Sequence, residues 1–190
     1  MKTATLIAKG PSASKAKDII GSDDYVAVIN DAGKLVSGIE IDYMFFAHTT
    51  VFPMLDHLKG RLKQAVSRRM NPLQLDEMPD WIRERHKMFD DWDCDADMNS
   101  LNGRLLAGGI MAHHTTSAAM HYLCKVEKFE KIKVIGVDGG LAYAEDLKKT
   151  PSFAVDLDLF LQIAKRVAII CSNVYQTEFE WYHYESNNTG

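Results

Sequence analysis

The chain has 190 residues, of which 46% are hydrophobic and 25% charged, proportions typical of a globular protein with one α/β domain. The formal net charge of -4 argues against binding to a nucleic-acid polymer, since Lys and Arg are concentrated only between Lys59 and Arg69. We find no signal-peptide pattern and no membrane-spanning run, and three scattered cysteines without a CxxC pair favour a reducing, cytoplasmic compartment.

The first predicted element is a buried strand over Thr3–Ala8, which is apolar and rich in β-branched residues. A turn at Gly10-Pro11 ends it, and Ser12 and Ser14 offer N-cap oxygens for a helix up to Ile20. Unpaired backbone N–H groups at such a helix start suit an anion such as a phosphate.

Two further strands are predicted over Tyr25–Asn30 and Asp42–Ala47, separated by short helical or turn segments. Each of these strands ends in polar residues. Because an open parallel sheet binds ligands outside the carboxyl ends of its strands, we expect one crevice there. The residues that would converge on it are Gly10, Ser12, Asn30, Asp31, His48 and Thr49.

The middle of the chain is less regular. A helix is expected over Val51–Leu58, Leu62–Arg68 fits either a helix or a strand, and Trp81–Phe89 fits one amphipathic helix. Pro72, Pro79 and the long irregular stretch favour a partly ordered lid or insertion over residues 69–109.

An acidic run within that lid places Asp93, Asp95, Asp97 and Asn99 at alternate positions of a calcium-loop pattern. The pattern requires Gly and Glu where Met98 and Arg104 stand, so a solvated acidic loop is the better interpretation. No set of His, Cys and carboxylate residues has the spacing of metal ligands, and we predict no metal site.

The second half of the chain predicts a helix over Ala118–Phe129, capped by Thr116 or Ser117 and preceded by His113 and His114. This second helix start again suits an anion. A strand over Lys131–Val137 then leads to Asp138 in a Gly-rich turn, and Tyr143 follows in a loop.

The remaining elements are an amphipathic helix over Ser152–Arg166 and a last core strand over Val167–Cys171. One domain over residues 1–175 is therefore expected, followed by a tail over 176–190. The aromatic part of the tail, Phe179–Tyr184, is expected to pack on the domain or on a second subunit of a homo-oligomer.

Four short segments resemble a known superfamily. They are Ala8-Lys9-Gly10-Pro11-Ser12, Val28-Ile29-Asn30, Thr115-Thr116-Ser117 and Ile135-Gly136-Val137-Asp138 with Ala142-Tyr143-Ala144. These segments are similar to bacterial sialyltransferases that use CMP-sialic acid, to motility-associated glycosyltransferases and to pterin diphosphokinase-like proteins. The resemblance covers residues 3–175, and Cys171-Ser172-Asn173 fits the same layout.

The resemblance implies an α/β, Rossmann-like, mostly parallel sheet with helices on both faces and a small lid, binding a nucleotide at its strand ends. It implies that Gly10, Pro11 and Ser12 lie beside the nucleotide, that Asn30 contacts cytosine and that Thr116 and Ser117 lie near the phosphate. Tyr143 matches a tyrosine that stabilises the leaving phosphate.

The chain also departs from the pattern. Lys9 stands where the family has Asn, and the first of the family's two tyrosines is replaced around Gly139-Gly140. Lys149–Ser152 occupies the place of the general-base histidine, and the acceptor-binding part is shorter.

Three functions remain open at this stage. The first is sugar transfer from a nucleotide-sugar, with His48, His113 or His114 as the base and Tyr143 as a donor to the phosphate. The second is Mg²⁺-dependent diphosphoryl transfer from ATP, with Asp31, Asp138 or the carboxylates of residues 90–97 near the ion. The third is nucleotide or sugar binding without catalysis. The candidate nucleotide-binding residues are Gly10, Pro11, Ser12, Asn30, Asp31, Thr116, Ser117 and Asp138.

Overall fold

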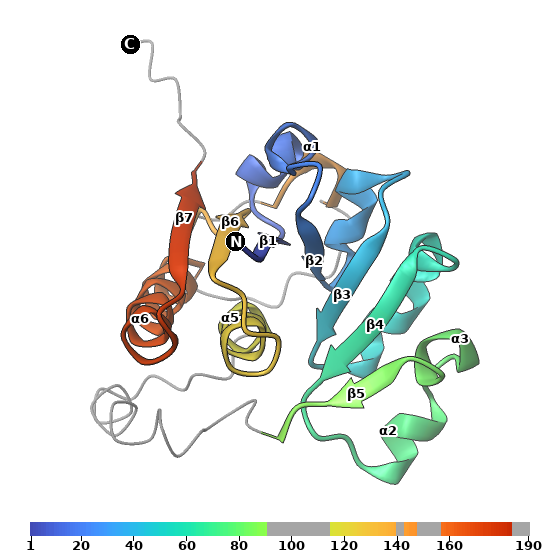
Figure 1. The fold of residues 1–190 in the computed structure, drawn as a ribbon. Helices are drawn as coiled ribbons and strands as arrows, with labels where there is room; N and C mark the ends of the chain where they lie inside the picture. The colour runs from blue at the N-terminus through green and yellow to red at the C-terminus, as the bar shows by residue number, and fades with distance from the viewer. Residues whose placement is uncertain (91–114, 140–142, 148–156, 184–190) are drawn as a thin grey trace.

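A seven-stranded, all-parallel sheet runs through the molecule in the order β5-β4-β3-β2-β1-β6-β7 (Figure 1). The computed structural model describes residues 1–90, 115–139, 143–147 and 157–183. The strands are β1 (Thr3–Ile7), β2 (Tyr25–Ile29), β3 (Ile41–Phe46), β4 (Leu62–Ser67), β5 (His86–Met88), β6 (Lys131–Ile135) and β7 (Glu178–Tyr182). The fold is therefore the α/β class that the sequence predicts.

Two longer helices, α5 (Thr115–Lys125) and α6 (Leu157–Tyr175), lie on one face of the sheet (Figure 1). Side chains alternate across the sheet, so Ala4 and Leu6 of β1 pack into the core beneath these helices. Ile7 points to the opposite face, where a second core forms.

Short helices cover this second core. They are η1 (Pro11–Lys15), α1 (Ala16–Ile19), η2 (Asn30–Val36), η3 (Thr49–Met54), η4 (Asp56–Leu58), α2 (Pro72–Asp76), α3 (Asp80–Arg83) and η6 (Glu145–Leu147). Most are 3-10 helices of one or two turns, so the connections after β1, β2 and β3 stay close to the strand ends.

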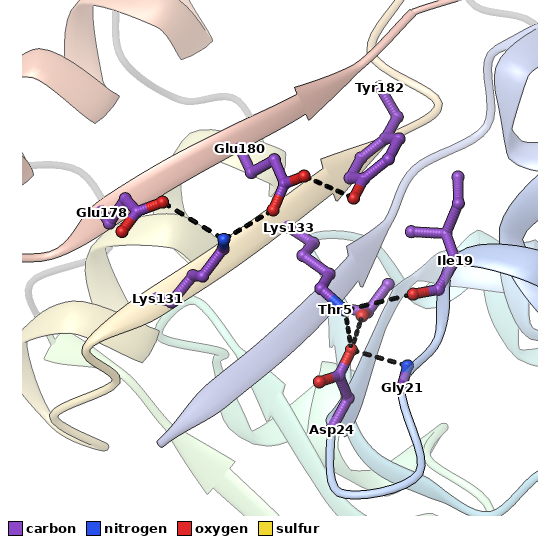
Figure 2. A network of polar contacts seen from close by, with 9 residues as sticks. All are labelled: Thr5, Ile19, Gly21, Asp24, Lys131, Lys133, Glu178, Glu180 and Tyr182. Carbon is purple, nitrogen blue, oxygen red and sulfur yellow. Dashed lines mark hydrogen bonds and ion pairs between the residues drawn. The ribbon is translucent and has the colours of Figure 1, made fainter. Parts of the chain in front are cut away.

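At β6 and β7 the second face carries paired charges (Figure 2). Lys131 lies 2.7 Å from Glu180 and 3.2 Å from Glu178. Further in, Asp24 accepts hydrogen bonds from the Thr5 hydroxyl at 2.6 Å and from Lys133 at 2.9 Å. Alternate residues of β6 on this face are lysines and not apolar residues. Their polar contacts join β6 to β1 and to β7.

Strand predictions for β1, β2, β3 and β6 are confirmed within one or two residues, and the open choice at residues 62–68 is resolved as β4. The prediction of one helix over Trp81–Phe89 is wrong, because a turn after α3 leads into β5. The prediction of one helix from Ser12 or Ser14 to Ile20 is also wrong in detail. η1 and α1 replace it, and no side chain caps either helix.

The largest correction concerns the end of the chain. The predicted strand over Val167–Cys171 is the second half of α6, which runs to Tyr175. Its buried side chains, Ile163, Ala164, Val167, Ala168 and Cys171, recur at helical spacing. Residues 178–182, expected in an aromatic tail, form β7, with Phe179 and Trp181 packed against the core beneath α6.

Candidate functional site

A cavity of about 300 Å³ opens at the carboxyl ends of β1, β2, β3 and β6. This is the point where strand order reverses, since the chain proceeds from β1 through β5 on one side and returns to β6 on the other. The cavity is lined by Ala8, Lys9, Gly10, Ile29, Asn30, Ala47, His48, Thr50, Val51, Thr115, Thr116, Gly136, Val137, Asp138, Gly139, Tyr143 and Phe160.

The cavity brings together six residues that the sequence singles out from five separate segments: Gly10, Asn30, His48, Thr116, Asp138 and Tyr143. Pro11, Ser12, Asp31, Thr49 and Ser117 are not among the lining residues. His114 lies outside the described residues, and so do residues 91–109 of the predicted lid, which include the acidic loop.

The Gly-Pro-Ser turn is closed by internal hydrogen bonds. The N–H of Gly10 donates to the carbonyl of Gly136 at 2.7 Å, and that of Ser12 donates to Asp138 Oδ2 at 2.8 Å. The N–H of Ala13 donates to Gly10 at 3.0 Å. The prediction of unpaired N–H groups at this turn is thus wrong, because the carbonyls of Gly136 and Gly10 and the carboxylate of Asp138 accept from these donors.

Close backbone packing explains the glycines at this turn. A Cβ at Gly10 would lie 2.5 Å from Asp138 Oδ2 and 2.8 Å from the Gly136 carbonyl oxygen. The Ser12 hydroxyl accepts from Gly136 N–H at 2.8 Å and donates to the Tyr182 carbonyl at 3.1 Å. Ser12 therefore joins β1, β6 and β7 structurally, and its contact with a ligand stays a prediction.

Asn30 is held in an unusual position after β2. Its φ is 51°, in the left-handed region that Asn tolerates better than most residues. Its carboxamide oxygen is buried and has no hydrogen-bond partner among the described residues. Since a buried acceptor without a partner is costly, this atom is suited to accept a hydrogen bond from a ligand.

His48 follows β3 and lines the cavity. Partial burial, and after it the positive charge of Arg68, lowers the pKa of His48 below its ordinary value. The imidazole is consequently neutral at neutral pH and can accept a proton.

The ring of Tyr143 lies beneath the ammonium group of Lys9. Burial, and then the carboxylate of Asp31, raises the pKa of the Tyr143 hydroxyl, which keeps it protonated and able to donate. The Nζ of Lys9 lies 4.6 Å from the centre of the Tyr143 ring, and the Ala144 N–H donates to the Lys9 carbonyl at 2.8 Å. The Tyr143 segment is thereby fixed to the end of β1.

Lys9 also pairs with Asp31, whose side chain is fully buried. Its Nζ lies 3.1 Å from Asp31 Oδ1, while Lys34 Nζ lies 3.4 Å from Oδ2. Burial lowers the pKa of Lys9, Asp31 opposes this effect, and the charge of Lys34 adds to it, with a lowered pKa as the result.

Sequence reasoning did not assign a role to Lys9 or to Phe160, which comes from the first turns of α6. A lysine directly after a buried strand and before a Gly-Pro turn was the available signal for Lys9. Phe160 falls within the amphipathic helix predicted over Ser152–Arg166, and an amphipathic pattern does not distinguish a residue of the core from one of a cavity wall.

Within the described ranges, we find no cluster of three His, Cys, Asp or Glu side chains able to hold a metal ion. Nor do those ranges contain a helix long and apolar enough to cross a membrane. A role for Mg²⁺ and a cytoplasmic location both stay predictions.

Comparison with solved structures identifies the fold. The sialyltransferase CstII from Campylobacter jejuni, in complex with the substrate analogue CMP-3FNeuAc, matches with a TM-score of 0.57 and 14% identity, covering 95% of this chain and 80% of that chain. A single-residue mutant of this alpha-2,3/8-sialyltransferase matches with a TM-score of 0.58 and 13% identity, covering 95% and 81%. No family model and no curated protein matches the sequence. These structures support a sialyltransferase-like fold and do not bear on the resemblance to pterin diphosphokinases.

Proposed function

We propose that this chain binds a nucleotide-sugar of the CMP-sugar type in the cavity and transfers the sugar to an acceptor. The proposal is supported by a fold shared with a sialyltransferase solved with a CMP-sugar analogue. It is also supported by the position of the cavity at the switch in strand order, where α/β folds of this kind bind nucleotides.

The single observation that carries the proposal is Asn30. Its buried carboxamide oxygen has no partner among the described residues and belongs to a side chain that lines the cavity. The exocyclic amino group of cytosine is a donor of the kind this oxygen needs. Asn30 would then select cytosine over uracil, which presents a carbonyl at that position and would leave two acceptors facing each other.

The transfer chemistry assigns roles to two further residues. The bond between the anomeric carbon and the phosphate oxygen breaks, and its electron pair stays on the phosphate of the departing CMP. The acceptor hydroxyl oxygen forms the new bond, and its proton passes to a base. His48 is neutral and lines the cavity, so it suits that role, while the Tyr143 hydroxyl donates to the leaving phosphate. His114 remains the second candidate base, predicted from sequence.

A thermal-shift screen over nucleotides and nucleotide-sugars, with Mg²⁺ and with EDTA, tests this proposal. We expect CMP and CMP-sugars to raise Tm in both buffers and UMP to have a much smaller effect. If cytidine nucleotides do not change Tm, the proposal is wrong.

Turnover separates catalysis from binding. Release of CMP from a CMP-sugar should fall at least tenfold in Tyr143→Phe and in either His48→Ala or His114→Ala. A Tm shift without release of CMP under any condition would instead support nucleotide binding without catalysis. Strict dependence on Mg²⁺, with ATP as the preferred ligand, would support diphosphoryl transfer.

A further inference from the structure

The ammonium group of Lys9 is a positive charge held at the cavity wall. Its side chain is only 11% exposed, lies over the ring of Tyr143 and pairs with the buried carboxylate of Asp31. A lysine in such a place must be compensated by nearby charge, since burial disfavours the ionised form.

The compensation leaves a surplus of positive charge. Asp31 carries one negative charge, and it is shared by Lys9 and Lys34 at 3.1 and 3.4 Å. The two lysines and the carboxylate therefore have a formal charge of +1. An anion in the cavity near Lys9 would neutralise that surplus.

The neighbouring turn does not provide an alternative site for the anion. The N–H groups of Gly10, Ser12 and Ala13 donate within the protein, and Asp138 adds a carboxylate to the same wall. Positive charge at this end of β1 comes from Lys9, where the resembling family has an uncharged Asn.

We propose that Lys9 binds the phosphate of the nucleotide donor, while Lys34 keeps Asp31 neutralised as Lys9 turns from the carboxylate to the ligand. This inference rests on the proposed function, and it makes Lys9 a binding residue particular to this chain. The exposure of Lys34, 38%, leaves it free to move closer to Asp31 as Lys9 departs.

The second lysine makes this movement feasible. When a buried carboxylate loses its one cationic partner, the uncompensated charge strongly destabilises the protein. Among the described residues, Asp31 has the cationic partners Lys9 and Lys34, so one can be withdrawn without leaving the carboxylate unneutralised. The Tyr143 ring remains beneath the ammonium group, and the Tyr143 hydroxyl can donate to the same phosphate.

Titration calorimetry with CMP and with cytidine, in buffer with EDTA, isolates the contribution of the phosphate. We expect the wild type to bind CMP at least tenfold more tightly than cytidine, the effect of one charge-assisted hydrogen bond. Lys9→Met and Lys9→Asn should reduce this ratio towards one, while affinity for cytidine changes less than threefold.

Two further variants sharpen the experiment. Lys15→Met, an exposed lysine in the same turn region, should keep the wild-type ratio. Lys34→Met should lower affinity for CMP and leave that for cytidine nearly unchanged, because Lys9 then stays bound to Asp31. If Lys9→Met does not fold, Lys9→Met with Asp31→Asn removes both buried charges, and it too should show a ratio near one.

The outcomes distinguish the two proposals. A wild-type ratio that survives in Lys9→Met or in the double variant overturns the role of Lys9 and leaves the proposed function standing. If the wild type binds neither CMP nor cytidine, the proposed function fails together with this inference.

The pH dependence offers a second measurement. Because the pKa of Lys9 is lowered from 10.5, its charge is lost at a lower pH than that of an exposed lysine. The ratio should therefore fall as pH rises from about 8 to about 10, a range in which the phosphate charge is constant. In Lys9→Arg, whose guanidinium stays charged, the ratio should not change over this range, and a wild-type ratio that stays constant contradicts the proposal.

Discussion

Gly136 and Gly38 share a left-handed backbone, with φ of +82° and +85°, but their surroundings differ. A Cβ at Gly38 meets nothing within 4 Å, whereas one at Gly136 would lie 2.7 Å from the carbonyl carbon and oxygen of Ala8. We expect Gly38→Ala to lower the free energy of unfolding by about 1 kcal/mol, the strain of the backbone alone. Gly136→Ala should lower it by about 3 kcal/mol or more, since β1 and β6 must separate.

Urea unfolding measures the free energy of unfolding of both glycine variants, and Gly38→Ala is the matched control. Equal losses of stability in the two would show that the approach of Ala8 to Gly136 is not needed for folding.

Asn30 permits an equally specific test of base recognition. Asn30→Gly removes the carboxamide and suits the left-handed backbone, so the fold should be retained. We expect affinity for cytidine to fall about tenfold or more in titration calorimetry, because one buried hydrogen bond is lost. Gln176→Gly is the control, since Gln176 is exposed and has a φ of 60° outside the cavity. Unchanged cytidine binding in Asn30→Gly would exclude base recognition by this side chain.

Residues directly after parallel strands were the predictable part of the site. Gly10, Asn30, His48 and Asp138 follow β1, β2, β3 and β6, whose carboxyl ends meet at one edge of the sheet. Lys9 was not predictable in this way. Its position depends on Asp31 and Tyr143, which are distant in sequence, and local pattern does not encode such ion pairs.

Among whole elements, the sequence predicted strands well where both faces are buried, as in β1, β2 and β3. It failed at the end of the chain because Val167–Cys171 is apolar and β-branched, which fits a strand or a buried helix equally well. In β7, outward Glu178 and Glu180 alternate with inward Phe179 and Trp181. That period-2 pattern was the missed signal.

Asp24 makes the stability of the contact between β1 and β6 depend on pH. Burial alone would raise the pKa of Asp24, but hydrogen bonds from Thr5, Gly21 and Lys133 outweigh it and lower the pKa (Figure 2). A lowered pKa in the folded state means that Asp24 contributes stability above its unfolded pKa and loses it as pH falls through the folded pKa.

We therefore expect Asp24→Asn to lower the free energy of unfolding by about 2 kcal/mol at neutral pH, as lost charge-assisted hydrogen bonds would. The difference from the wild type should shrink as pH is lowered below about 4 in urea unfolding experiments. Asp23→Asn, at the exposed neighbouring position, should leave stability within about 0.5 kcal/mol of the wild type. A pH-independent difference for Asp24→Asn would contradict this role of the charge.

At the scale of the whole molecule, β7 completes the sheet beside β6. A chain that ends at residue 176 loses Phe179 and Trp181 from the core, together with the Tyr182 carbonyl that accepts from Ser12. It also exposes β6 as an unpaired edge. We expect this variant to unfold at least about 10 °C below the wild type or to aggregate, as followed by circular dichroism and size-exclusion chromatography.

The control is a chain that ends at residue 183, which retains all of β7 and should melt as the wild type does. Wild-type melting of the chain that ends at 176 would show that the first six strands are sufficient.

The hydrogen bond from Ser12 to Tyr182 spans 170 positions of the sequence, which has a consequence for synthesis. When only β1 to β5 have left the ribosome, the nascent chain already contains Lys9 and Asn30. It contains neither Gly136 nor Asp138, which also line the cavity. The cavity therefore remains incomplete until β6 and the residues that follow it have joined the sheet.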